Sequence, residues 1–149
     1  MKKDLLVRQN DLKDCGVCCL ESIFKYYDGY IPIETLRIDT NTTIEGTNAY
    51  NLINTAKKYG LNGRGRKIEE LDEKILLPAI AHLRLNNGLQ HFVVIYKVDN
   101  KKKMVTLMDP AKGKKVISFS EFNLLSSGNF LFLYPLKKLP IMNNKKIIF

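Results

Sequence analysis

The sequence predicts an α+β fold in which N-terminal helices pack on a C-terminal antiparallel β-sheet. Two observations support this class. Before about residue 60, apolar residues recur at three- and four-residue steps, the period of helices with one buried face. After Pro78, short apolar runs show the two-residue period of strands. Helices followed by strands is the order of a segregated α+β fold, so a doubly wound βαβ fold is not expected.

Two helices are expected, with a candidate for a third. The first begins near Cys15, because apolar residues recur from Val17 to Tyr27 and Asp28-Gly29 ends the pattern. The second is expected from about Thr47, a possible N-cap, to Tyr59, with Gly60 as its stop. Residues 69–76 are a candidate for a short third helix.

The second part of the chain is expected to form five antiparallel strands. They are predicted at residues 79–83, 91–98, 104–108, 115–119 and 130–134. At 149 residues the chain has the size of one domain, which we place at residues 1–136. Residues 137–149 mix lysine with apolar residues and show no period. They are interpreted as a basic linker-like tail, compatible with a connection to a membrane domain.

The charge is strongly basic, with 24 Lys and Arg against 15 Asp and Glu and a net charge of +9. This balance favours acidic partners. The lysines concentrate in turns and at the carboxyl end without interleaved aromatic residues, so nucleic acid is not an expected partner. A solvated surface and a surface that attracts an acidic peptide or anionic lipid headgroups remain about equally compatible with the charge.

The three cysteines crowd into residues 15–19, which does not suit the disulfide framework of a secreted domain. The N-terminus lacks the apolar stretch of a signal peptide, and the other apolar runs are too short to cross a bilayer. We therefore expect a soluble domain that faces the cytoplasm. Localisation at the inner face of the plasma membrane is compatible with this expectation.

Cys15 is the candidate nucleophile, because it stands at the predicted start of a helix with Asp14 as the expected N-cap. Unpaired amides and the helix dipole favour a thiolate at such a position. Gly16 is expected to leave room for a substrate backbone. Cys18 and Cys19 lie inside the helix and are assigned to packing.

Two other uses of the cysteines are weaker alternatives. Cys15 and Cys18 form a Cys-x-x-Cys pair, which suggests thiol redox chemistry, but the βαβ context of that motif is missing. A zinc site completed by His82 or His91 lacks a second Cys pair. We therefore expect neither a metal nor a cofactor.

His91 is the candidate base, because the predicted hairpin around Asp99-Asn100-Lys101-Lys102 brings a carboxylate to it. A three-residue loop, Asp99 to Lys101, places His91 directly opposite Asp109, within hydrogen-bonding reach. A one-residue shift in register would put the two side chains on opposite faces of the sheet. His82 has no such partner and is assigned a structural role.

Gln9 is the candidate donor to an oxyanion, since acyl transfer through a thiolate requires amide donors near the nucleophile. It lies six residues before Cys15. An exposed glutamine near the end of a strand is an equally good interpretation of this residue on its own.

Three motifs in this order resemble the double-glycine leader peptidase domain of bacteriocin-exporting ABC transporters, a papain-like cysteine peptidase. They are Gln-Asn-Asp-Leu-Lys-Asp-Cys-Gly-Val-Cys-Cys-Leu at 9–20, His-Phe-Val-Val at 91–94 and Asp-Pro at 109–110. The resemblance spans about residues 5 to 136. It implies Cys15 as nucleophile, His91 as base, Asp109 as its orienting acid and Gln9 as oxyanion donor.

The resemblance also implies a substrate and partners. The domain would cleave after a Gly-Gly or Gly-Ala pair at the end of a helical leader on a precursor peptide bound for export, in the cytoplasm and without metal or cofactor. The membrane and ATP-binding domains of an ABC transporter are further partners that it implies. Cys18 departs from the family, which more often has a small residue such as Ala there. A core substitution is the first interpretation, and a Cys15–Cys18 disulfide that switches activity off is a second.

Two other functions remain open. One is a leader-binding module without catalysis, and the other is a thiol oxidoreductase that uses Cys15 and Cys18.

Overall fold

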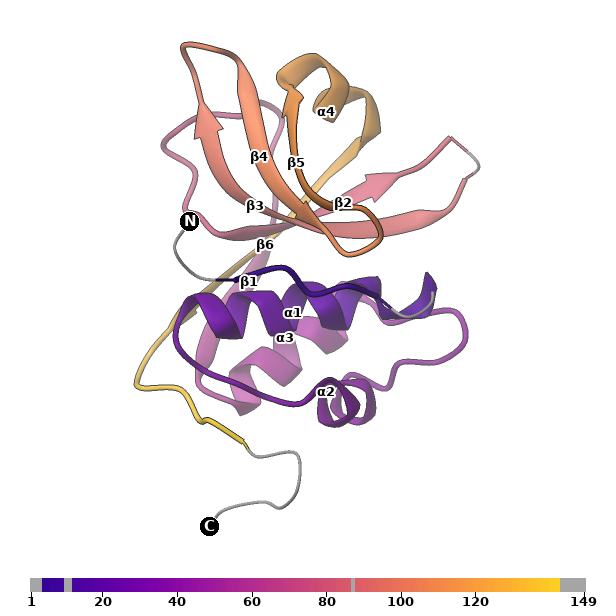
Figure 1. The fold of residues 1–149 in the computed structure, drawn as a ribbon, viewed down its shortest axis with the longest axis vertical. Coiled ribbons are helices and arrows are strands. Elements are labelled where there is room, and N and C mark those ends of the chain that lie inside the picture. The colour runs from indigo at the N-terminus through magenta and orange to yellow at the C-terminus, as the bar shows by residue number, and fades with distance from the viewer. Residues whose placement is uncertain (1–3, 10–11, 87, 143–149) are drawn as a thin grey trace.

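The computed structural model describes residues 4–9, 12–86 and 88–142, which form two layers (Figure 1). One layer holds the helices α1 (Cys15–Tyr26), α2 (Ile33–Asp39) and α3 (Ala49–Lys58), preceded by the 3-10 turn η1 (Leu12–Asp14). The other layer is a sheet, and α4 (Phe119–Leu125) lies on the side of it away from α1. The strands are β1 (Leu61–Lys67), β2 (Ala79–Arg84), β3 (Gln90–Asp99), β4 (Met104–Asp109), β5 (Gly113–Ser118) and β6 (Ser126–Pro135).

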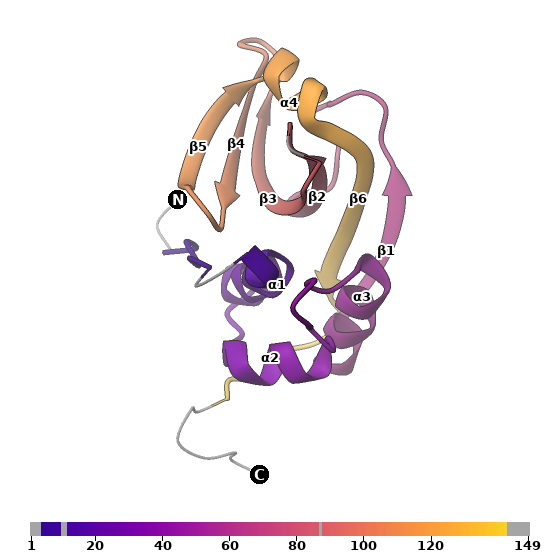
Figure 2. The ribbon, with the colours of Figure 1, turned by 90° about the vertical axis from the view of Figure 1, so that its right-hand side faces the viewer.

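The predicted α+β class is confirmed. The six strands form one antiparallel sheet in the order β1-β6-β2-β3-β4-β5, and the sheet is strongly curled (Figure 2). α1 packs against β3. Because side chains alternate along a strand, Phe92 and Val94 of β3 join the core beneath α1, while Val93 and Ile95 join a second core. β3 therefore connects the two cores.

The five predicted strands are found with shifted ends, but β1 was not predicted. Its Gly63 and Gly65 interrupt the apolar pattern and are poor strand formers. Gly63 is required by packing, since a Cβ there would collide with the side chain of Leu133 on β6. Phe119, predicted at the end of a strand, instead begins α4.

The helix predictions were right for α1 and only partly right elsewhere. α1 begins at Cys15 as expected. α3 is capped by Asn48, whose side chain accepts from the Asn51 amide at 2.8 Å, and not by Thr47. Residues 69–76 form turns, so the third predicted helix was wrong. α2 and α4 have seven residues each, too few to establish a helical period.

The segment before residue 143 contacts the helical layer. Leu139 is buried, the Tyr30 amide donates to the Pro140 carbonyl at 3.0 Å, and the Met142 amide donates to the Tyr30 carbonyl at 2.8 Å. The remainder of the predicted tail, residues 143–149, lies outside the described residues. The domain end at 136 stays a prediction. In the part of the chain that the structure describes, no helix combines the length and apolarity needed to cross a bilayer.

Candidate active site

Cys15 and His91 meet where the first turn of α1 approaches the start of β3. Cys15 is the first residue of α1, and its side chain is buried but for 8% of its surface. Its thiol hydrogen-bonds with the imidazole of His91, which is also buried. Two residues 76 positions apart in the sequence are thereby brought together at the junction of the two layers.

Asp109 holds the other side of the imidazole. Its Oδ1 lies 2.7 Å from His91 Nε2, and the same oxygen accepts from the Ala111 amide at 2.8 Å. Because Nε2 faces Asp109, Nδ1 is the nitrogen left for the thiol. The carboxylate is therefore placed to fix both the tautomer and the orientation of the ring.

This arrangement favours a charged imidazole. Burial lowers the pKa of His91, but the hydrogen bonds to Asp109 and Cys15 and the charges of those groups outweigh it and raise the pKa to about 9. Burial raises the pKa of Asp109, yet the hydrogen bonds from His91 and the Ala111 amide dominate, and the net shift is downward. The geometry thus stabilises a charged imidazole beside the Asp109 carboxylate.

The contact between His91 and Asp109 is confirmed, but the predicted register was wrong. Asp99 pairs with Met104, so the loop has four residues, and Lys103 adopts a positive φ of 55°. Asp99 stays in the strand because its Oδ1 accepts from the amides of Lys101 and Lys102 at 3.0 and 3.1 Å. The predicted loop, Asp99 to Lys101, therefore begins one residue too early, although Asp99 is a residue that favours such an Asx turn.

A β-bulge at Tyr96 brings the side chains of His91 and Asp109 back to the same face of the sheet. On the loop side Lys97 pairs with Thr106, a register that would bring Val94 opposite Asp109 and put His91 on the other face. Beyond the bulge Val94 pairs with Met108, which brings Val93 opposite Asp109. His91 therefore reaches Asp109 as a diagonal neighbour on the same face.

Asp14 occupies the N-cap position of α1, as predicted, but its side chain makes no cap hydrogen bond. Both carboxylate oxygens bind Arg37 of α2 instead, with Nε to Oδ1 at 3.0 Å and Nη2 to Oδ2 at 2.7 Å. Arg37 was missed because α2 was missed, and no motif marks it.

Gly16 is required by packing between helices. A Cβ at this position would lie 2.9 Å from Thr47 Cγ2 and 3.4 Å from Leu52 Cδ1. The expectation that Gly16 leaves room for a substrate is therefore replaced, because the space beside it is filled by the α3 region.

Gln9 lies beside the segment that carries Asp109. Its amide donates to the Pro110 carbonyl at 2.9 Å, and its side-chain Oε1 is buried with no hydrogen-bond partner among the described residues. Its role as an oxyanion donor stays a prediction.

The other candidate thiols and the second histidine lie apart from this contact. Cys18 and Cys19 are fully buried, and all three cysteines are free. Burial, followed by the charge of Asp14, raises the pKa of Cys18 to about 12. His82 Nδ1 lies 2.8 Å from Ser127 Oγ. Across residues 4–9, 12–86 and 88–142, no group of three or more His, Cys, Asp or Glu is arranged to hold a metal ion.

An open groove of about 530 Å³ lies near the start of β3. Gln90 and Phe92, the chain neighbours of His91, line this groove, whereas Cys15, His91 and Asp109 are not among its lining residues. The groove is apolar at its base and carries cations on β1; the lining residues are Thr47, Asn48, Ala49, Gly65, Arg66, Lys67, His82, Gln90, Phe92, Asn129, Phe130 and Leu131.

Comparison with known proteins identifies a single family. The model of the peptidase C39 family matches residues 3–138. The lactococcin-G-processing and transport ATP-binding protein LagD of Lactococcus lactis subsp. lactis is 41% identical over 138 residues, which cover 91% of this chain and 19% of LagD. The transport/processing ATP-binding protein ComA of Streptococcus pneumoniae is 31% identical over 133 residues, or 85% of this chain and 18% of ComA. The chain thus spans less than a fifth of the length of these relatives.

Solved structures show the same fold. A double glycine motif protease from an AMS/PCAT transporter, in complex with the leader peptide, has a TM-score of 0.79 and 31% identity, covering 87% of this chain and 90% of that one. The peptidase domain of Streptococcus ComA, described as a bi-functional ABC transporter, has a TM-score of 0.81 and 30% identity, covering 87% of this chain and 97% of that one.

Proposed function

This chain belongs to the peptidase C39 family, and we propose on that premise that it is a cysteine endopeptidase that removes the leader from a bacteriocin or similar exported peptide. Cleavage follows a Gly-Gly or Gly-Ala pair at the end of the leader. The observation that carries the proposal is the buried chain of contacts from the Cys15 thiol through His91 to Asp109 at the start of α1.

The reaction follows from this arrangement. The Cys15 thiolate attacks the carbonyl carbon of the last leader residue and forms a tetrahedral oxyanion. His91, as imidazolium, gives its proton to the leaving amine, the C–N bond breaks, and a thioester remains on Cys15. His91 then takes a proton from water, which attacks the thioester and releases the leader as a carboxylic acid. Asp109 orients the ring and stabilises its charge through both steps.

The oxyanion needs donors that point at the developing charge. The backbone amide of Cys15, at the first turn of α1, is one donor. We assign the second to the side-chain amide of Gln9, whose backbone is tied to the Pro110 carbonyl beside Asp109.

We place a helical leader in the groove near the start of β3. Phe92, Phe130 and Leu131 offer an apolar base for one face of an amphipathic helix. Arg66 and Lys67 on β1 line the same groove and would attract acidic side chains on the other face. Replacing Arg66 by Glu is expected to raise KM for an acidic leader while kcat changes little. Lys102→Glu, the same charge change at the exposed hairpin loop, is the matched control.

The relatives suggest where the domain works. They are transport and processing ATP-binding proteins of which this chain matches under a fifth. We propose that the domain acts beside the membrane and ATP-binding parts of an ABC transporter, on the cytoplasmic side of the membrane.

The test is cleavage of synthetic leader peptides that end in Gly-Gly, followed by mass spectrometry. Cys15→Ala is expected to abolish cleavage, and Cys18→Ala, one turn along the same helix, is expected to retain it. Unchanged cleavage by Cys15→Ala would refute the nucleophile. Binding without cleavage by the wild-type chain would support a leader-binding module, and loss of activity in Cys18→Ala with retention in His91→Ala would support an oxidoreductase.

A further inference from the structure

The residue that precedes the nucleophile forms an ion pair with a residue of another helix. The Asp14 side chain is only 1% exposed, and both of its oxygens are bound by the guanidinium of Arg37, at 3.0 and 2.7 Å. Such a two-point contact fixes the orientation of the carboxylate as well as balancing its charge. Asp14 directly precedes Cys15, so this pair lies at the first turn of α1.

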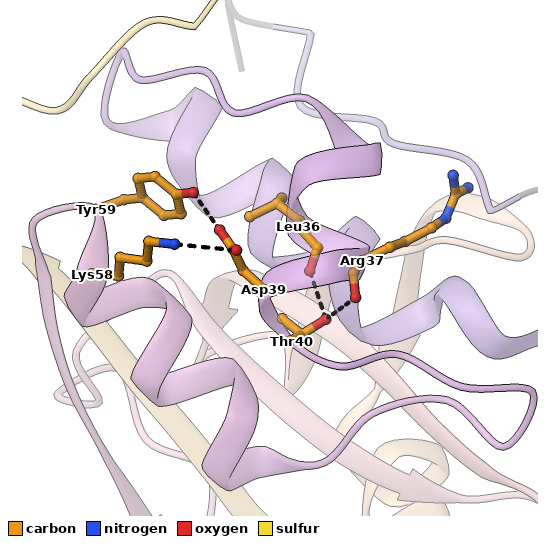
Figure 3. A network of polar contacts seen from close by, with 6 residues as sticks. All are labelled: Leu36, Arg37, Asp39, Thr40, Lys58 and Tyr59. Atoms are coloured by element: carbon orange, nitrogen blue, oxygen red, sulfur yellow. Dashed lines mark hydrogen bonds and ion pairs between the residues drawn. The ribbon is translucent and has the colours of Figure 1, made fainter. Parts of the chain in front are cut away.

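The position of Arg37 is set by contacts that join α2 to α3. Figure 3 shows Asp39, two residues further along, accepting from the Tyr59 hydroxyl and pairing with Lys58 at 3.2 Å, while Arg37 extends away from this network. The Thr40 hydroxyl donates to the Leu36 carbonyl at 2.6 Å and closes the end of α2. α2 is thus tied to the end of α3, and Arg37 reaches Asp14 from a fixed base.

The charge of the Asp14 carboxylate matters because the residue lies beside the first turn of α1. An Asp that caps a helix normally has an extended backbone and accepts from a first-turn amide. Asp14 makes no such bond, and its helical backbone, with φ −92° and ψ 0°, continues η1 into α1. If its charge were not balanced, the carboxylate would place an anion next to Cys15, where it would oppose both a thiolate and an oxyanion.

We propose that Arg37 is a positioning residue for the peptidase reaction: by binding both oxygens of the buried Asp14 carboxylate and balancing its charge, it keeps the first turn of α1 favourable to the Cys15 thiolate and the oxyanion. The inference rests on the proposed function. Burial and then the Asp14 charge raise the pKa of Cys18 on the same turn, whereas Arg37 lowers it, so both charges act on this turn with opposite signs.

The other titratable groups near Cys15 that the described residues supply come from β3, β4 and α1. His91 faces it from β3, Asp109 lies behind His91 on β4, and Cys18 and Cys19 share its helix. His91 and Asp109 are present in every variant below, so a change in pH dependence reports the Asp14–Arg37 pair.

The test measures alkylation of Cys15 by iodoacetamide against pH, with no leader present, and identifies the modified residue by peptide mass spectrometry. Arg37→Met is expected to raise the pH of half-maximal alkylation by about one unit, as a nearby unbalanced anion does. Adding Asp14→Asn to Arg37→Met is expected to return it to near the wild-type pH. Lys58→Met, which removes a cation paired with Asp39, is the matched control and is expected to leave it unchanged.

A double variant shifted as far as Arg37→Met would overturn the proposal, because the pair would then only join two helices. An unshifted Arg37→Met would overturn it as well. Circular dichroism checks folding, and if Arg37→Met does not fold, Arg37→Lys keeps the charge without the two-point grip and is expected to shift alkylation by a smaller amount; no shift in that variant counts against the proposal. Since alkylation needs no substrate, a failure of leader cleavage would be seen separately.

Discussion

At the scale of single residues, the site depends on the balance of forces on one imidazole. Burial alone would make His91 neutral near pH 7, yet Asp109 and Cys15 raise its pKa to about 9. His91 can therefore act as an acid toward the leaving amine at neutral pH. Asp109 supplies part of this shift through its charge and part through its hydrogen bond.

Replacing Asp109 by Asn separates these two parts. The amide keeps an acceptor near Nε2 but removes the charge, so the pKa of His91 is expected to fall by about 1–2 units. The alkaline limb of kcat/KM against pH, expected near pH 9 in the wild type from the pKa of His91, should move to lower pH by that amount. Asp99→Asn in the hairpin loop is the control. An alkaline limb that stays in place in Asp109→Asn would mean that Asp109 does not set the charge of His91.

Gly16 gives a second prediction at this scale. Its missing Cβ would lie 2.9 Å from Thr47 Cγ2, and the Thr47 hydroxyl is held by the Thr40 carbonyl at 2.8 Å. Gly16→Ala should destabilise the fold by on the order of 1 kcal/mol, since overpacking costs about 1–3 kcal/mol and helix propensity offsets about 1. Gly65→Ala, whose Cβ would be 3.7 Å from its nearest neighbour, is the control in urea unfolding. Equal stability of the two variants would contradict the packing role of Gly16.

At the scale of elements, the sequence predicted the parts with a long period and missed the short ones. α1 and the strands that follow Pro78 bury a continuous face, so their pattern was visible. α2 was not predicted because seven residues do not establish a period, although its Arg37 binds Asp14 directly before α1. α4 carries a signal that was overlooked, the Ser118-x-x-Glu121 cap in which Ser118 Oγ accepts from the Glu121 amide at 3.0 Å.

The hairpin shows why a correct contact can follow from a wrong register. A bulge adds a residue to one strand, and nothing in the local pattern around Tyr96 marks it. The four-residue loop shifts the register by three residues and the bulge shifts it back by one. Because each shift is odd, each reverses the facing, and their effects cancel at His91 and Asp109. The Tyr96 hydroxyl contacts Ser22 Oγ of α1 at 2.5 Å, a tertiary contact that sequence reasoning does not supply.

The contacts of Asp39 with Tyr59 and Lys58, which join α2 to α3, can be tested by substitution. Tyr59→Phe removes the hydroxyl that donates to Asp39, and we expect a loss of about 0.5–1.5 kcal/mol in the free energy of unfolding. Tyr50→Phe at an exposed position of α3 is the matched control. Thermal unfolding of both variants gives the comparison. A Tyr59→Phe protein as stable as Tyr50→Phe would show that the Tyr59–Asp39 hydrogen bond does not stabilise the contact between α2 and α3.

At the scale of the whole molecule, the site is a product of tertiary folding. Cys15 comes from the helical layer and His91 and Asp109 from the sheet, so their contact forms only when α1 packs on β3. The ionisation of the site is therefore linked to the stability of the entire domain.

The sign of this linkage follows from the pKa of His91. Its folded value of about 9 exceeds the reference value of 6.5, so its contribution is complete below pH 6.5, falls as the pH rises, and is lost above about 9. The contribution is about 3 kcal/mol at most, because one pKa unit corresponds to about 1.36 kcal/mol. Urea unfolding at pH 6 and pH 9.5 should show a larger alkaline loss in the wild type than in His91→Gln. Equal losses in the two proteins would contradict the linkage.

The most direct test of the peptidase assignment is covalent capture at Cys15. A synthetic leader that ends in a glycine chloromethyl ketone should alkylate the Cys15 thiolate, forming a thioether and releasing chloride, because the ketone takes the place of the scissile carbonyl. We expect mass spectrometry of the intact complex and its fragments to find one leader attached at Cys15, and none in Cys15→Ala. Attachment at Cys18, or an equal amount of attachment in Cys15→Ala, would contradict the account.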